Sequence, residues 1–252
     1  MANNTKVITT QQAMRYSRQI SLQGFDLDKQ EQLMSSRVLI IGMGGLGCAA
    51  SQYLVASGLG SLSIVDDDTV ELTNLQRQIL HYETNIGDSK VDSAKASLQA
   101  LNGDCEIRAL NERLNELALR KLILEHDLVL DCCDNLATRN MVNDACYASK
   151  VPLVSGAAIR MEGQIFCVMP SLNSACYRCI SRFFGEQSLS CVEAGVMSPL
   201  VGIVGACQAL EGIKILTNFG QTPINSLQIY DAMSSQWQTF KVEPQHDCQG
   251  CR

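Results

Sequence analysis

The sequence predicts a doubly wound α/β fold, in which one mostly parallel sheet continues into an antiparallel C-terminal extension. Three observations support this prediction. Up to Ser155, short apolar runs rich in Val, Ile and Leu alternate with stretches of helical periodicity, which is the pattern of repeated βα units. A glycine-rich turn, Gly42–Gly47, joins the first such run to the helix that follows it. After Ser155 longer strand-like segments take over, as is typical of antiparallel pairing.

Residues 1–36 precede this pattern and are expected to form N-terminal helices, at 11–20 and 26–35. The first residues are polar and contain no apolar core of a signal peptide, so we expect a cytoplasmic protein. In that reducing compartment the twelve cysteines are expected to be ligands, nucleophiles or core residues, and not disulfides.

Residues 37–155 are expected to be the nucleotide-binding half of the sheet and residues 156–252 the antiparallel half. No hinge rich in Pro or Gly separates them, so 1–252 is expected to be a single domain. Strands are expected at 37–41, 61–65, 105–109, 128–130, 151–154, 164–169, 227–230 and 236–240. Helices are expected at 46–54, 91–101, 116–124, 135–149 and 201–216.

Charge and hydropathy exclude two classes of partner. The most apolar segment, about 200–216, contains Gln208, Glu211 and Lys214, and a buried helix explains it better than a membrane span. The net charge is −6, from 20 Lys and Arg against 26 Asp and Glu, and no basic run is present. Neither a membrane nor a nucleic acid is therefore an expected partner.

The glycine turn predicts a phosphate-binding site of the Rossmann-like kind. It follows a strand and opens a helix, so its backbone N–H groups and the positive helix end can face a phosphate. Asp66 ends the next strand, about 20 residues further on, where an acidic side chain accepts hydrogen bonds from a ribose hydroxyl. The alternative is a tight strand–helix turn that needs glycine only for packing.

Charged residues at other strand ends favour Mg-ATP over NAD as the nucleotide. A Gly-x-x-x-x-Gly-Lys-Ser/Thr loop is absent from the sequence. Arg77, Lys90, Asp134 and Asn135 are expected to converge on the same crevice, because the carboxyl ends of parallel strands share one edge. Two cations would offset phosphate charge and a carboxylate would hold Mg²⁺. Each of these residues could instead be a solvated surface group.

Two Cys-x-x-Cys pairs predict a structural zinc site. Cys176, Cys179, Cys248 and Cys251 offer four thiolates, which suit closed tetrahedral zinc without an open position for water. The alternative is a set of free thiols on exposed loops.

Several segments together resemble the ATP-dependent activating enzymes of ubiquitin-like proteins. The resemblance extends from about Tyr16 to Cys251. It rests on the glycine turn, on Asp134 with Asn135, on the two cysteine pairs, and on segments 15–19, 74–78, 151–160 and 191–197. One departure is Cys133, which stands where the family often has threonine.

The resemblance implies an adenylation reaction. ATP and the C-terminal glycine carboxylate of a small ubiquitin-like sulfur carrier with a Gly-Gly tail would give an acyl-adenylate and pyrophosphate. The expected carrier is the small subunit of molybdopterin synthase, and the expected pathway is molybdenum cofactor biosynthesis. By position, the residues implied to contact ATP or its Mg²⁺ are Gly45, Asp66, Asn74, Arg77, Lys90 and Asp134. Arg18 would reach the phosphates of the partner subunit in a homodimer.

Such chemistry needs no general base. A terminal carboxylate has a pKa of about 3.5 and is already ionised at neutral pH, so charge neutralisation and in-line placement suffice. The sequence fits, because none of its histidines, His81, His126 and His246, lies in a nucleophile motif. All three are expected to be surface or capping residues.

Cys191 differs from the other cysteines because it lies in a polar loop. In related enzymes a cysteine here forms a thioester or persulfide with the carrier, so a catalytic role and a passive one are both open. The remaining cysteines are expected in the core: Cys48, Cys105, Cys132, Cys133, Cys146, Cys167 and Cys207. No sulfurtransferase domain follows Cys251, so a separate sulfur-donor protein is expected.

Three other functions remain open at this stage. Activation of the thiamine-pathway sulfur carrier would use the same fold, zinc and chemistry. A zinc-containing NAD dehydrogenase would need a second zinc site with an open position, and the sequence offers no such site. A non-catalytic scaffold for a ubiquitin-like partner would have no need of Arg18, Arg77, Lys90 and Asp134.

Overall fold

The computed structural model describes residues 6–182 and 194–251 and contains one eight-stranded sheet. Its strand order is β3-β2-β1-β4-β5-β6-β7-β8. Neighbours from β3 to β5 are parallel, and β6, β7 and β8 are each antiparallel to the strand before. The strands are β1 Arg37–Ile41, β2 Ser61–Val65, β3 Glu106–Leu110, β4 Leu128–Asp131, β5 Leu153–Ile159, β6 Glu162–Val168, β7 Ser226–Asp231 and β8 Gln236–Lys241. The predicted fold class is confirmed.

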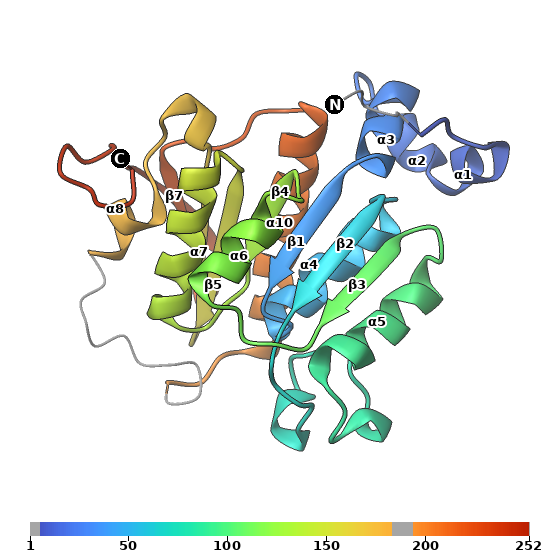
Figure 1. Cartoon of the computed structure of the whole chain (residues 1–252), viewed down its shortest axis with the longest axis horizontal. Coiled ribbons are helices and arrows are strands. Elements are labelled where there is room, and N and C mark those ends of the chain that lie inside the picture. The colour runs from blue at the N-terminus through green and yellow to red at the C-terminus, as the bar shows by residue number, and fades with distance from the viewer. Residues whose placement is uncertain (1–5, 183–193, 252) are drawn as a thin grey trace.

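Helices cover both faces of the sheet (Figure 1). The α-helices are α1 Thr10–Arg15, α2 Ser17–Ile20, α3 Asp26–Met34, α4 Gly45–Ala56, α5 Lys90–Leu101, α6 Glu116–Ile123, α7 Leu136–Ser149, α8 Tyr177–Ser181 and α10 Ser198–Thr217. Three single 3-10 turns are η1 Leu72–Asn74, η2 Glu83–Asn85 and η3 Pro170–Leu172. In the view of Figure 1, α6 and α7 lie in front of the sheet and α4 and α10 behind it.

The sheet separates two apolar cores, because successive side chains of a strand point to opposite faces. Val38 and Ile40 of β1 pack with residues of α4, α5 and α10. Leu39 and Ile41 of the same strand pack with residues of α6, α7 and α8. All four are buried, which explains why the strand reads as a continuous apolar run in the sequence.

The two largest differences from the sequence prediction concern the first helix and the fifth strand. The helix expected at 11–20 is split at Tyr16, whose ring is buried and whose hydroxyl accepts a hydrogen bond from Asn102. This tertiary contact ends α1, and helical periodicity alone could not reveal it. The strand expected at 151–154 runs on to Ile159, because antiparallel pairing with β6 extends beyond the parallel pairing with β4. The sheet is therefore continuous through Ser155 and Gly156.

Helix α10 packs closely against α4 and the sheet. A Cβ atom on Gly205 would lie 2.5 Å from the Leu46 carbonyl oxygen, so glycine permits the close helix crossing. Among the described residues, α10 is the one helix long and apolar enough to cross a membrane by length and composition. The structure buries 56% of that stretch, and Gln208 within it donates hydrogen bonds to the Asp131 and Val154 carbonyls.

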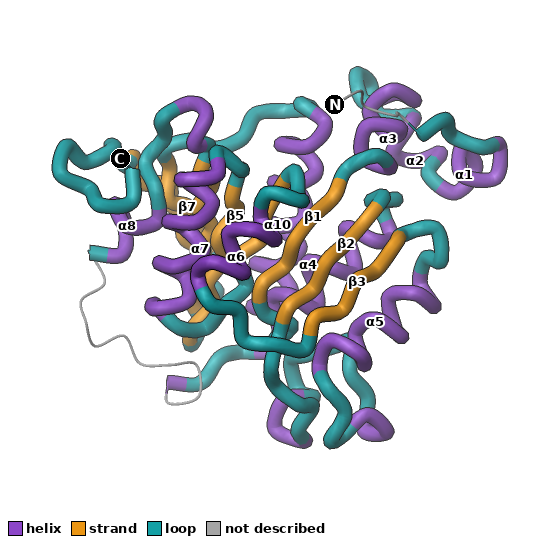
Figure 2. The backbone as a smooth tube through the Cα atoms, in the orientation of Figure 1, coloured by secondary structure: helices purple, strands orange, loops and turns teal. Residues whose placement is uncertain are grey.

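The strand order creates a crevice at the carboxyl ends of β1 and β4. After β1 the chain enters α4 on one face, and after β4 it enters α7 on the other. Because β1 and β4 are parallel neighbours, both strands end at the same edge of the sheet, which is the lower edge in Figure 2. In doubly wound sheets such a switch point is where ligands bind.

Candidate nucleotide site and cysteine cluster

The glycine turn is held tightly by its own backbone. Gly42 has φ of +95°, in the region that favours glycine. A Cβ atom on Gly47 would lie 2.0 Å from the Gly42 carbonyl oxygen, so no other residue fits there. The turn therefore brings the start of α4 directly beneath the end of β1.

Gly45 serves packing and also lines the crevice. A Cβ atom here would meet Val201 Cγ2 at 2.6 Å and the Arg77 carbonyl oxygen at 3.2 Å. Helix α4 begins at this residue without a side-chain cap, so its first N–H groups keep their capacity to bind an anion. Close packing therefore explains in part why glycine stands at this position, and it does not exclude phosphate binding.

Asp66 braces the glycine turn from the end of β2. Its Oδ2 accepts a hydrogen bond of 2.6 Å from the Met43 N–H, and its Oδ1 accepts one of 2.9 Å from the Asp68 N–H. Burial raises the pKa of the Asp66 carboxyl, although these hydrogen bonds and the charge of Lys90 oppose that shift. Each oxygen retains a lone pair that could accept from a ligand hydroxyl.

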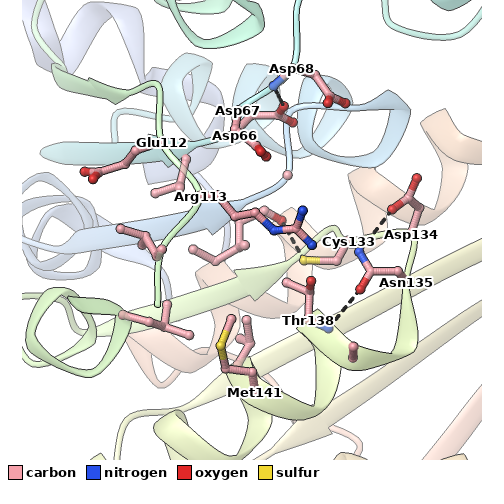
Figure 3. A pocket seen from close by; sticks show the side chains of 17 residues that line it. Asp66, Asp67, Asp68, Glu112, Arg113, Cys133, Asp134, Asn135, Thr138 and Met141 are labelled. Carbon is pink, nitrogen blue, oxygen red and sulfur yellow. Dashed lines mark hydrogen bonds between the residues drawn. The ribbon is translucent and has the colours of Figure 1, made fainter. Parts of the chain in front are cut away.

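Two cavities open at the crevice and share Asp66 and Asp134 as common wall. The larger, about 530 Å³, extends from β2 to the start of α7. Figure 3 shows Glu112 on one side of it and Asn135 on the other, with the guanidinium of Arg113 between them in this view. The smaller, about 330 Å³, lies on the glycine-turn side. Its lining includes Gly45, Asp66, Asn74, Arg77, Lys90 and Asp134, so the structure brings these six candidates together.

The two candidate cations are held differently. Lys90 is buried at the start of α5, and its Nζ lies 2.7 Å from Asp68 Oδ2. Arg77 is half-buried, and its Nη1 donates to the Thr73 carbonyl at 3.0 Å. Asp68 also lines the smaller cavity, and the sequence did not predict this. Its position shortly after the strand 61–65 was the one indication that it could lie there.

Both candidate asparagines also fix local structure. Asn74 is buried, and its side-chain oxygen accepts from the Glu71 N–H at 3.1 Å, closing the turn that carries Arg77. Asn135 caps α7 by accepting from the Thr138 N–H at 2.9 Å. These contacts orient the two loops that flank the crevice.

The larger cavity contains residues that the sequence did not indicate. Arg113 and Glu112 follow β3, and Thr138 and Met141 lie on α7. The only available signal was the position of Glu112 and Arg113 just after a weak strand at the sheet edge.

One predicted residue, Arg18, stands apart from this site. Arg18 is exposed on α2, at the amino end of the strands and opposite the crevice (Figure 1). The crevice residues of the same chain are thus not its neighbours. Cys191 lies outside the described residues.

The histidine expectation is wrong for His81. Its ring is buried, with Nδ1 2.9 Å from Ser93 Oγ and Nε2 3.4 Å from the Met43 carbonyl oxygen. His126 caps α6 at the Leu122 carbonyl as expected, but it is buried rather than on the surface. The burial of the two rings could not be read from local sequence, because His81 contacts Met43 and His126 contacts Ser63, which come from distant segments. Burial lowers the pKa of both rings.

The four cysteines of the two Cys-x-x-Cys pairs form one cluster, with their sulfur atoms within 4.8 Å of one another. The Sγ atoms of Cys176 and Cys248 are 3.6 Å apart, and those of Cys179 and Cys251 are 3.4 Å apart. Disulfides would need about 2.05 Å. Tetrahedral zinc with Zn–S bonds of about 2.3 Å places its sulfurs about 3.8 Å apart, so this donor set fits zinc.

Local backbone supports this cluster. A Cβ atom on Gly250 would lie 2.9 Å from Cys176 Sγ, so only glycine lets the chain pass so closely. Burial alone would raise the pKa of Cys248, but hydrogen bonds that include the N–H groups of Gly250 and Cys251 lower it. Backbone donors aimed at a sulfur favour its thiolate form.

Most of the expected core cysteines are confirmed. Cys48, Cys105, Cys132, Cys133, Cys146 and Cys167 are buried, while Cys207 is half-buried. Burial raises the pKa of each of these thiols, for Cys48 to about 12. They are therefore protonated at neutral pH and unsuited to nucleophilic attack.

The chain is similar to known proteins in sequence and in fold. The model of the ThiF family matches residues 16–250. The chain is 52% identical to the molybdopterin-synthase adenylyltransferase of Escherichia coli K12 over 97% of this chain and 98% of that protein. It is 43% identical to the sulfur carrier protein ThiS adenylyltransferase of the same organism, over 94% of each. The crystal structure of E. coli MccB with ATP matches with a TM-score of 0.82 at 22% identity, over 94% of this chain and 74% of that one, and so shows the same fold.

Proposed function

The chain belongs to the ThiF family, and we infer that it is an adenylyltransferase that uses ATP to activate the C-terminal glycine of a small ubiquitin-like sulfur carrier. The carrier that we propose is the small subunit of molybdopterin synthase, in molybdenum cofactor biosynthesis. The observation that supports this most directly is the convergence of Arg77, Lys90, Asp66 and Asp134 around an uncapped helix start at the switch point.

The two cavities suit the two ends of ATP. We propose that the adenosine occupies the larger cavity and that its ribose meets Asp66 on the shared wall. The phosphates would then enter the smaller cavity, toward Gly45, Arg77 and Lys90. This arrangement puts negative charge at the positive end of α4, where it is favoured.

Asp134 is the residue that we propose for Mg²⁺. Its carboxylate is exposed on the shared wall, and carboxylate together with phosphate oxygens is the usual magnesium environment. Lys90 already pairs with Asp68, so a bound phosphate would compete with that carboxylate for its ammonium group.

The reaction requires no proton acceptor. The ionised glycine carboxylate attacks the α-phosphorus, an oxygen–phosphorus bond forms, and the bond to the bridging oxygen breaks as pyrophosphate leaves with its electrons. The developing charge would be met by Arg77 and Lys90. His81 and His126 line neither cavity, in keeping with a reaction that uses no histidine base.

We also propose a homodimer in which Arg18 acts in the site of the partner subunit. Its exposure and its distance from the crevice of its own chain support this arrangement, since from that position it could reach a crevice only in a neighbouring chain. Cys191 is proposed as the candidate for a covalent link to the carrier.

A structural Zn²⁺ held by Cys176, Cys179, Cys248 and Cys251 completes the proposal. The ion would join the start of α8, with Cys176 just before it and Cys179 within it, to the last residues described, and would leave no site for water. With the sheet continuous through both halves, we propose that 1–252 acts as one adenylating domain. We propose that the protein works in the cytoplasm, a reducing compartment in which free thiols such as those of the described cysteines are usual.

Activation of the thiamine-pathway carrier is the second candidate function, because a ThiS adenylyltransferase is also a relative. ATP–pyrophosphate exchange with purified carriers of both pathways distinguishes the two. We expect exchange with the molybdopterin-synthase subunit and little with the other carrier. Exchange with neither carrier would contradict the proposed function.

A further inference from the structure

Resting on the proposed function, we propose that Arg139 is a positioning residue for adenylation: its buried guanidinium fixes the peptide before Asp134 and so orients that carboxylate. Arg139 lies in the first turns of α7, away from both cavities. It touches no proposed ligand position and would act only through the loop.

A closed set of hydrogen bonds surrounds the loop Asp131–Asp134. One carboxylate oxygen of Asp131 accepts from the Cys133 N–H at 3.0 Å. The other accepts from Ser155 Oγ at 2.6 Å and lies 3.4 Å from Arg139 Nη1. Arg139 Nη2 donates to the Cys133 carbonyl oxygen. The N–H and the C=O of Cys133 are therefore both held, and the direction of the chain into Asp134 is determined.

The arrangement is rigid because its charges are buried. The side chains of Arg139 and Asp131 are only 7% and 1% exposed. A buried ion pair tolerates little displacement, since loss of either partner leaves an uncompensated charge. Tyr177 closes the remaining side, with its ring centroid 5.7 Å from the guanidinium carbon.

The loop also contacts the glycine turn directly. A Cβ atom on Gly42 would lie 2.8 Å from the Cys132 carbonyl oxygen and 3.4 Å from the Cys133 nitrogen. A shift of Cys133 would therefore disturb both walls of the crevice. Only a planar, forked cation can bond Asp131 and the Cys133 carbonyl together, and lysine cannot reproduce this geometry.

The test is a double-mutant cycle on Mg-ATP affinity, measured by calorimetry on folded, full-length protein. We expect Arg139→Lys to weaken Mg-ATP binding by about tenfold in the wild-type background, and to change it little once Asp134→Asn is present. If Arg139 merely supported the fold, Arg139→Lys would weaken Mg-ATP binding by the same factor in both backgrounds. Arg178→Lys is the matched control, because Arg178 pairs with Asp144 of α7 and makes no contact with the loop.

If Arg139→Lys does not fold, Ser155→Ala removes one hydroxyl partner while both charges stay paired, and the same cycle applies with a smaller loss of about threefold. Equal Mg-ATP affinity in Arg139→Lys or Ser155→Ala and wild type, or equal losses in both backgrounds, would overturn the positioning role. A wild-type chain that does not bind Mg-ATP would instead refute the proposed function itself.

Discussion

The carboxylate of Asp66 holds the N–H of Met43 at 2.6 Å, and so the end of β2 fixes the conformation of the glycine turn after β1. One side chain thereby shapes the glycine turn and also lines both cavities. On the proposed function, we expect stability and nucleotide affinity to be coupled at this residue.

Replacing Asp66 tests that coupling. Asp66→Asn should lower the free energy of unfolding by about 1–3 kcal/mol, because one amide group cannot accept from two N–H groups as the carboxylate does. It should also raise the KM for ATP. Denaturant unfolding and exchange kinetics measure the two effects. Asp28→Asn, at an exposed position of α3, is the control, and normal stability with normal KM in Asp66→Asn would contradict the assignment.

The charged groups of the smaller cavity should dominate the rate. Arg77→Ala and Asp134→Ala are each expected to lower ATP–pyrophosphate exchange by about 10² or more, the scale for a lost electrostatic contact to the transition state. Arg120→Ala is the control, because it removes the same positive charge as Arg77→Ala from an exposed position on α6. Near-normal exchange in the two crevice variants would remove Arg77 and Asp134 from the mechanism.

The proposal that Arg18 acts in the site of the partner subunit can be tested by mixing subunits. Arg18→Ala and Arg77→Ala homodimers should each be inactive. Random exchange of their subunits should restore about a quarter of wild-type activity, because half of the dimers contain one complete site. If Arg18 acted within its own chain, every site in the mixture would lack one arginine, and no activity would return.

Metal analysis should find one zinc per chain. Cys248→Ser should lose the metal and unfold at a lower temperature, because a structural zinc contributes directly to folding. Cys207→Ser is the comparison, since its thiol lies outside the cluster. A Cys248→Ser protein that lacks zinc and melts with the wild type would show that the cluster has no structural role.

Stability should fall in mildly acidic solution. Burial lowers the pKa of His81 and His126 below the ordinary value of 6.5. The unfolded chain then binds protons more readily than the folded one. Their stabilising contribution is therefore complete above pH 6.5 and is lost as the pH falls toward the folded pKa values. His126→Gln should show a weaker decline than wild type in urea unfolding at several pH values. If the free energy of unfolding of His126→Gln declined with pH as steeply as that of wild type, the lowered pKa of His126 would be contradicted. His246→Gln, at an exposed position, is the control.

The sequence predicted the candidate site residues that lie just after the carboxyl ends of parallel strands. Apolar runs mark the strands, and parallel strands present their carboxyl ends at one edge, so the convergence of Gly45, Asp66 and Lys90 could be predicted. Arg139 could not, because its burial depends on Ser155 and Tyr177 from other segments. The buried position of His81 and the pairing of Lys90 with Asp68 depend on tertiary contacts in the same way.

The shared wall of the two cavities has a consequence for inhibition. On the proposed placement of ATP, a compound that carries an adenosine-like group and an uncleavable mimic of the acyl phosphate would reach both Asp66 and Asp134 and fill both cavities at once. Tethering makes the second contact intramolecular, so such a bisubstrate compound should bind far more tightly than either fragment.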